Sequence, residues 1–165
     1  MIKVFISHQK TDSEKASEIS NRLKYYHNID TYLDIIDNQL NKSGDDLALH
    51  IRTEMSKCTQ LLAVVSYATR ESQWVPWEIG VATEKNFPLA TFANYTSPVP
   101  EFLRAWPYLR SMSDVDAYAN ASKRAVDNLR VQKSLHTQDT AMRKAANSFF
   151  FDLRRSLGQP TTSRG

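Results

Sequence analysis

Two neighbouring stretches decide the fold: LLAVVS at residues 61–66 and SQWVPWEIG at residues 72–80. The first is a continuous apolar run, which is typical of a parallel strand buried on both faces. The second predicts a helix, because Pro76 suits a first helical turn, where its missing N–H is not needed. Trp74 and Glu78 are four residues apart and therefore share one face of that helix. A carboxylate beside an indole at the end of a buried strand is suited to hold a sugar or a nucleotide, so this segment separates an enzyme from a pure interaction domain.

The same strand-then-helix pattern continues on both sides of this unit. Hydrophobic patterning predicts strands at residues 2–7, 29–33, 61–66 and 87–92, and a short fifth strand at 108–110. Amphipathic segments predict helices over residues 13–26 and 45–58, and the Trp74 helix completes the series. We therefore predict an α/β fold, a flavodoxin-like three-layer sandwich with a central parallel sheet of about five strands in the order 2-1-3-4-5.

The C-terminal part of the sequence does not continue the alternation of strands and helices. Residues 94–107 carry three prolines, Pro98, Pro100 and Pro107, and are expected to be irregular, with a short helix at 102–105. Residues 114–157 predict two helices with a break near 137–139, the second docked through Phe149, Phe150, Leu153 and Leu157. We expect a single domain over 1–157, with a core at 1–120 and a helical extension at 121–157, followed by a flexible tail at 158–165.

Composition excludes several function classes. The chain has 165 residues and a formal net charge of +3, with no long basic run, so nucleic acid is not an expected partner. Its longest apolar run is far below the ~18 residues of a membrane helix, so no membrane partner is expected, and the cytoplasm is the expected location. Cys58 is the single cysteine and is expected to be a small buried thiol.

Motifs that are missing narrow the chemistry further. The four glycines, Gly44, Gly80, Gly158 and Gly165, form neither a dinucleotide-binding fingerprint nor a phosphate loop. No His and Cys cluster has metal-ligand spacing, and no nucleophile elbow occurs. The sequence therefore predicts no metal and no bound cofactor.

The assumed strand order places a ligand crevice where the order reverses, between the first and third strands. The loops there are residues 7–12 and 66–72, which brings His8, Lys10, Tyr67, Trp74 and Glu78 toward one place. Each has a plainer alternative: Glu78 as an exposed helix carboxylate, the tryptophans as packing residues, His8 as a helix cap and Lys10 as a solvated side chain. The loop 34–44 carries Ile35, Ile36 and Leu40, and apolar residues at a loop tip suggest a partner or a lid.

The order and spacing of these segments resemble the Toll/interleukin-1 receptor (TIR) domain family. Residues 2–8, with Lys10 and Asp12, resemble its opening box. Residues 32–34 followed by Gly44 and a helix resemble its second strand and BB loop. Residues 62–66, then Ser72, Trp74 and Glu78, resemble the third strand and catalytic helix of NAD-cleaving members, and residues 108–118 resemble the last strand region of bacterial members.

The resemblance implies a chemistry and a set of site residues. Many bacterial and plant members cleave NAD⁺ at the nicotinamide–ribose bond, which makes NAD⁺ a substrate here rather than a cofactor. Glu78 matches the catalytic glutamate. The residues expected around the substrate are Ser7, His8, Lys10, Asp34, Ser66, Tyr67 and Trp74. Residues 75–77 depart from the family pattern, because many members carry a cysteine before the glutamate, and His8-Gln9 replaces the frequent Tyr-basic pair.

The family also suggests partners. Its BB loop often completes a neighbouring protomer's pocket, which gives Ile35, Ile36 and Leu40 a role in self-association. A stand-alone enzyme resembles the Thoeris type of antiphage protein, whose ADP-ribose-derived product activates a separate effector. The alternatives are a non-catalytic adaptor acting by TIR–TIR assembly, and a nucleoside deoxyribosyltransferase-like enzyme acting on a free nucleoside.

Overall fold

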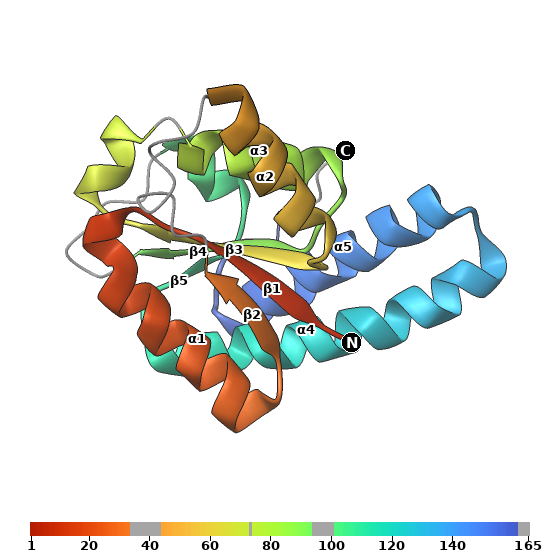
Figure 1. Cartoon of the computed structure of the whole chain (residues 1–165). Coiled ribbons are helices and arrows are strands. Elements are labelled where there is room, and N and C mark those ends of the chain that lie inside the picture. Colours follow the sequence, from red (N-terminus) through yellow and green to blue (C-terminus); the bar gives the residue numbers. More distant parts are fainter. Residues whose placement is uncertain (34–43, 73, 94–100, 162–165) are drawn as a thin grey trace.

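The computed structural model describes residues 1–33, 44–72, 74–93 and 101–161. Its centre is a five-stranded parallel sheet in the order β2-β1-β3-β4-β5. The strands are β1 (Lys3–Ser7), β2 (Asp30–Leu33), β3 (Gln60–Val65), β4 (Leu89–Ala93) and β5 (Tyr108–Leu109). Helices cover both faces of the sheet (Figure 1), so the predicted flavodoxin-like α/β fold and strand order are confirmed.

Five α-helices connect and flank the described strands. They are α1 (Ser13–His27), α2 (Gly44–Ser56), α3 (Trp74–Glu84), α4 (Met112–Leu135) and α5 (Gln138–Ser156). Short 3₁₀ turns precede α1 at Lys10–Asp12, follow β3 at Tyr67–Glu71, and precede β5 at Glu101–Ala105. None of the helices in the described ranges is both long and apolar enough to cross a membrane.

The sheet separates two hydrophobic cores because alternate side chains of each strand point to opposite faces. Val4 and Ile6 of β1 pack with α1, α4 and α5, whereas Phe5 packs with α2 and α3. All six residues of β3 are buried, as expected for a central parallel strand. This burial fixes β1 and β3 side by side, and so fixes the place where both strands end.

Asparagine marks the exit of two helices and explains two predicted boundaries that are wrong. Asn28 and Asn86 both have φ 54°, the left-handed conformation that ends a helix. The N–H of the next residue then bonds back into the helix, from Ile29 to Leu23 O at 3.1 Å and from Phe87 to Ala82 O at 3.0 Å. Ile29 and Phe87 thus belong to the caps, and their strands begin one and two residues later, at Asp30 and Leu89.

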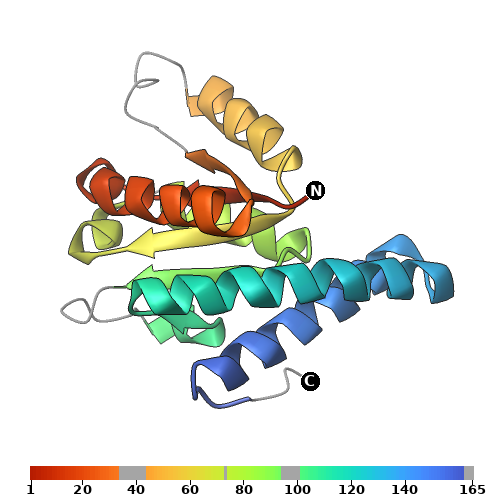
Figure 2. The same cartoon turned by 90° about the horizontal axis from the view of Figure 1, so that it is seen from below.

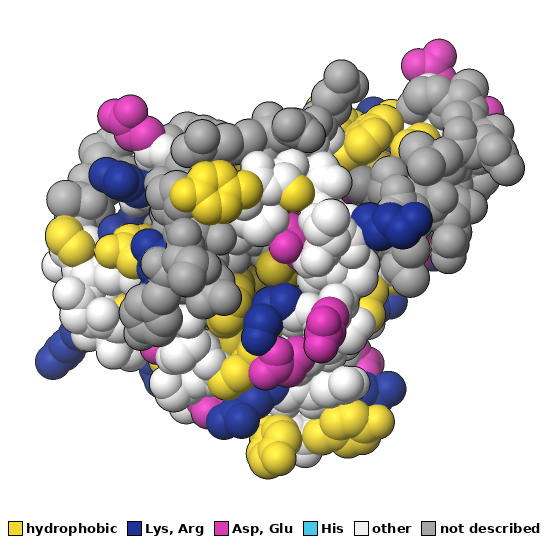
Figure 3. Space-filling model, turned by 90° about the vertical axis from the view of Figure 1, so that its left-hand side faces the viewer, with side chains coloured by type: hydrophobic (Ala, Val, Ile, Leu, Met, Phe, Trp, Pro, Cys, Tyr) yellow, Lys and Arg dark blue, Asp and Glu magenta, His cyan; other side chains and the backbone are white. Residues whose placement is uncertain are grey.

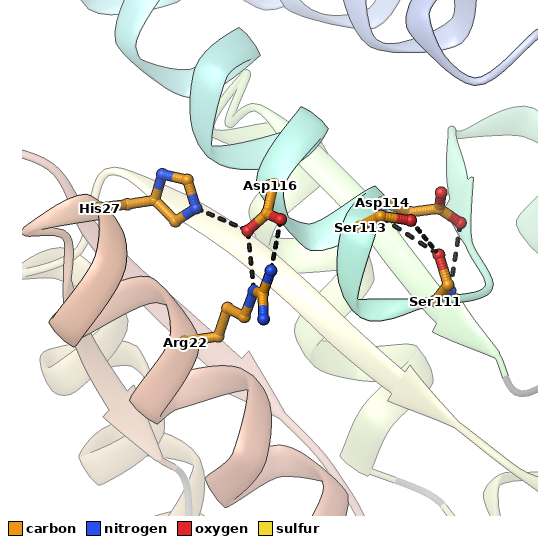
Figure 4. Close-up of polar contacts among 6 residues, drawn as sticks. All are labelled: Arg22, His27, Ser111, Ser113, Asp114 and Asp116. Atoms are coloured by element: carbon orange, nitrogen blue, oxygen red, sulfur yellow. Dashed lines mark hydrogen bonds and ion pairs between the residues drawn. The ribbon is translucent and has the colours of Figure 1, made fainter.

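A polar cluster of Arg22, His27 and Asp116 joins α1 to α4. Arg22 donates to the Asp116 carboxylate through Nε at 2.8 Å and Nη2 at 2.6 Å, and His27 Nε2 lies 2.7 Å from its Oδ1 (Figure 4). The Arg22 hydrogen bond is the main reason that the pKa of Asp116 is lowered to about 2. One turn earlier, Ser111 and Asp114 form a capping box that starts α4.

The C-terminal helices form a long hairpin that extends past the amino edge of the sheet (Figure 2). The predicted two-helix division is present, with the break at 136–137, and α4 begins at Met112 rather than residue 114. Phe149 and Leu153 are buried, and Phe150 and Leu157 pack against the same core, as predicted.

Two features bear on the predicted domain limits. Because α4 runs unbroken from Met112 to Leu135, the proposed division at residue 120 falls inside a helix. Within the expected tail, the Gln159 amide donates to Tyr108 O at 2.6 Å and accepts from Tyr108 N at 3.3 Å. Residues 162–165 lie outside the described range.

Candidate active site

The site is built where β1 and β3 end. Ser7 closes β1 with its side chain fully buried, and its hydroxyl donates to the Glu78 carboxylate across 71 positions of sequence. Glu78 lies in the second turn of α3, the helix that follows β3. The strand order and the short β3–α3 connection thus bring the two side chains together at the carboxyl edge of the sheet.

Glu78 is 0% exposed, so the alternative of an exposed helix carboxylate is wrong. Removing an ionised carboxylate from water carries a penalty of several kcal/mol, which a packing role would not require. Its neighbours Val75, Ile79 and Ala82 on α3 are buried and apolar. A carboxylate kept in this position is a candidate functional group on physical grounds.

His8 follows Ser7 and is nearly buried as well. Its Nδ1 lies 3.2 Å from the carbonyl oxygen of Ile6. A carbonyl only accepts, so Nδ1 carries a hydrogen, and Nε2 of a neutral ring is left as an acceptor. The backbone of β1 therefore fixes the orientation of this ring, and the helix-cap alternative for His8 is not what the structure has.

Ser66 and Asp12 hold the two crevice loops together. The Ser66 hydroxyl donates to Asp12 Oδ2 at 2.8 Å and accepts the N–H of Ala68 at 3.2 Å. Asp12 directly precedes α1, but its side chain makes no cap hydrogen bond to that helix. No local sequence pattern indicates this contact, because Asp12 and Ser66 are 54 positions apart and only their shared sheet edge brings them into range.

The aromatic residues near Glu78 differ in exposure. Trp74 and Trp77 are half-buried and meet edge to face, with ring centroids 5.6 Å apart and planes at 87°. Both pack against the core formed with α2 and α3, so the packing role proposed for them is present. Tyr67 is 62% exposed and Lys10 is exposed, which places both outside the buried pair.

Ser72 caps the start of α3, and Pro76 lies in its first turn as predicted. The Ser72 hydroxyl accepts the N–H of Val75 at 3.1 Å, as an N-terminal cap does. Pro76 is the third residue of the helix and is exposed. Its missing N–H is still harmless there, since the first four N–H groups of a helix have no partner within it.

Figure 3 faces the carboxyl edge of the sheet, and side chains of both charges gather there with hydrophobic ones between them. Four residues predicted for this region, Asp34, Ile35, Ile36 and Leu40, lie outside the described residues. The described part of the chain contains no group of three His, Cys, Asp or Glu side chains arranged to hold a metal ion.

Cys58 lies away from this edge, at the amino end of β3. It is buried as predicted, and burial raises the pKa of its thiol to about 11.

The fold and the Ser7–Glu78 pair define the class as a flavodoxin-like α/β domain with a buried carboxylate at the end of its central strands. Residues 4–130 match the family model described as TIR domain, which is more than half of the chain. The chain therefore belongs to the TIR domain family.

No curated protein matches the chain in sequence. Among solved structures, the chain is similar to the TIR domains in the structure of the activated Roq1 resistosome directly recognizing the pathogen effector XopQ. The identity is 18%, the match covers 98% of this chain and 93% of that one, and the TM-score is 0.46. We draw nothing about function from a likeness at that level.

Proposed function

We propose that this TIR domain is an enzyme that cleaves NAD⁺ at the nicotinamide–ribose bond, a NAD⁺ nucleosidase or ADP-ribosyl cyclase-type hydrolase. The observation that carries the proposal is the fully buried Glu78 carboxylate, bound by Ser7 where β1 and β3 end. The family match supplies the context, because TIR domains can be NAD-cleaving enzymes.

A single carboxylate suits this reaction. The bond from ribose C1′ to the pyridinium nitrogen breaks, its electron pair goes to nitrogen, and neutral nicotinamide leaves without being protonated. The ribose then carries oxocarbenium-like positive charge, which the Glu78 carboxylate stabilises. Ser7 is a positioning residue in this scheme, because its hydrogen bond orients the carboxylate.

Trp74 and His8 complete the proposed site. Trp74 offers an aromatic surface one helical turn before Glu78, on which nicotinamide or a second base can stack. Tyr67, Lys10, Ser66 and Asp34 are the other residues that we propose to contact NAD⁺. A site that excludes water favours cyclisation or conjugation of the ADP-ribosyl group over hydrolysis.

The burial of Glu78 also bears on how the enzyme is switched on. A carboxylate with no exposed surface cannot contact substrate until neighbouring groups move. We propose that TIR–TIR assembly causes this movement.

In the active assembly, Ile35, Ile36 and Leu40 of the BB loop contact the next protomer. The product acts on a separate effector, by analogy with the Thoeris type of bacterial antiphage defence.

The alternative is a non-catalytic adaptor that works only by assembly. In that case Glu78 stays covered in the assembled state too. The two functions differ in a single outcome, namely whether nicotinamide appears when concentrated protein meets NAD⁺.

The test is to incubate concentrated protein with NAD⁺ and identify products by mass spectrometry. We expect nicotinamide release, reduced at least ~100-fold in Glu78→Gln. Glu84→Gln is the matched control, since Glu84 is an exposed carboxylate on the same helix. The mass of the second product separates hydrolysis from cyclisation or conjugation. Absence of release in protein shown by light scattering to be assembled supports the adaptor instead.

A further inference from the structure

A pocket of about 550 Å³ lies at the opposite edge of the sheet from Glu78. The amino ends of β3 and β4 and the α3–β4 turn form one wall, and the overhanging hairpin of α4 and α5 forms the other. Ligand pockets in proteins occupy about 300–1,000 Å³, so this space is large enough for a small organic molecule.

The walls of this pocket are mainly apolar. Cys58 and Phe87 come from the strand side, Val126 and Leu129 from α4, and Met142 from α5. Such a lining favours a ligand with an apolar body, because each methylene removed from water strengthens binding about fourfold.

One buried polar group interrupts the apolar wall. Gln60, only 2% exposed, lines the pocket, and its Oε1 accepts hydrogen bonds from Tyr118 at 3.0 Å and Ser122 at 2.7 Å. Within the described residues, nothing accepts a hydrogen bond from the Gln60 Nε2 amide. An amide donor on a side chain that lines the pocket, and that is held in place by its own oxygen, is suited to bind an acceptor atom of a ligand.

The charges at the pocket are positive. Lys85, Arg130 and Lys133 line it, and none of the lining residues within the described ranges is acidic. Asp127 does contact Arg130, but at 3.5 Å with both side chains 76% exposed, which leaves most of that charge to solvent. Asp139 lies close by, bound by the Asn86 amide at 3.2 Å. Lys85 and Lys133 have no such carboxylate partner among the described residues.

We infer that this pocket binds a small amphipathic anion, with its apolar body against Phe87, Leu129 and Met142 and its carboxylate or phosphate facing Lys85 and Lys133. The site is separate from the proposed NAD⁺ site, since Gln60 begins β3 and Ser66 follows the other end of that strand. Its ligand does not compete with a nucleotide bound at Glu78.

Methionine methyl NMR tests the inference, because the chain has only four methionines and they include one in the pocket and one away from it. Met142 lines the pocket, whereas Met112 starts α4 at the far end of the hairpin. Decanoate and decyl phosphate are titrated in turn, with uncharged decanol as the matched probe. We expect saturable shifts of the Met142 methyl with either anion, none at Met112, and binding of decanol weaker by about three- to tenfold. Comparison of the two anions identifies the preferred head group.

Two pairs of variants assign the binding to this pocket. Val126→Trp fills it, whereas Val131→Trp adds the same bulk to an exposed position of the same helix. Lys133→Ala removes a rim charge, and Lys123→Ala is its exposed counterpart outside the lining. We expect the first of each pair to weaken anion binding at least about threefold and the second to leave it unchanged. An unmoved Met142 methyl, equal affinity for decanol, or equal losses within either pair would each overturn the inference. The lysine pair decides if Val126→Trp does not fold.

Discussion

The two ends of the central strands carry buried polar clusters of opposite character. At the amino edge, the Gln60 amide accepts hydrogen bonds from Tyr118 and Ser122, all three side chains being uncharged and buried. Burial raises the pKa of the Tyr118 hydroxyl far above its ordinary value, so this cluster stays neutral. At the carboxyl edge, the Ser7 hydroxyl binds a buried carboxylate, Glu78.

The difference separates structure from function. A neutral group loses little on burial when it is hydrogen-bonded, so the amino-edge cluster stabilises the packing of α4 on β3. A buried carboxylate is a poor choice for stability, because its desolvation is offset only by excellent pairing. Clusters that look alike in exposure are therefore expected to respond to mutation in opposite directions.

The largest effect is expected at the amino edge. Gln60→Leu leaves the hydroxyls of Tyr118 and Ser122 buried without an acceptor, at about 1–3 kcal/mol each. We expect the free energy of unfolding to fall by about 3 kcal/mol, measured by urea denaturation. The triple variant that adds Tyr118→Phe and Ser122→Ala removes the stranded donors and is expected to recover most of that loss. A stable Gln60→Leu single variant would show that the two clusters do not differ as described.

Features of the fold and the site could be predicted from the sequence when the residues that make them are close together in the chain, and not when these residues are far apart. The alternation of apolar runs and amphipathic helices is local, and it predicts a parallel α/β sheet. With a flavodoxin-like strand order assumed, it also brings the loop at residues 7–12 and Glu78 to one edge of the sheet. Gln60 is 58 and 62 positions from its partners on α4, so no local pattern indicates that cluster or the pocket beside it. Asn28 and Asn86 are local signals that were available, since asparagine before a buried apolar residue is typical of a helix exit.

The second expected effect has the opposite sign. Glu78→Gln removes a buried charge and keeps a side chain that can bond to Ser7, so the free energy of unfolding is expected to rise by about 1 kcal/mol. Thermal unfolding of the same samples used for the NAD⁺ assay measures it. Glu84→Gln again serves as the control, with a change within about 0.5 kcal/mol expected for an exposed position.

A loss of stability in Glu78→Gln would show that the buried Glu78 carboxylate stabilises the fold, as the Gln60 cluster does. The carboxylate would then act as a structural partner of Ser7, like the amide of Gln60 on the other edge. Stabilisation together with lost NAD⁺ cleavage is the result that a functional carboxylate predicts.

The third effect is no larger than the second and concerns a charged cluster that is only partly buried, Arg22–His27–Asp116. The pKa of Asp116 falls from 3.8 to about 2 on folding, chiefly through the Arg22 hydrogen bond. A depressed carboxyl pKa contributes stability that is fully present above the unfolded pKa and is lost as the pH falls toward the folded one. Since the Asp116 side chain is 31% exposed, solvent screening reduces the contribution to about 1 kcal/mol.

Asp116→Asn is therefore expected to lower the free energy of unfolding by about 1 kcal/mol near neutral pH, and by much less near pH ~2, where about half of the wild-type carboxylate is itself protonated. Asp127→Asn on the same helix is the matched control, because its pair with Arg130 is 76% exposed on both sides and is expected to contribute almost nothing. Urea denaturation of the three proteins at both pH values measures the difference. Equal changes in the two variants would mean that partial burial adds nothing to an ion pair here. The free energy that each polar cluster contributes to folding would then not depend on how far the cluster is removed from water.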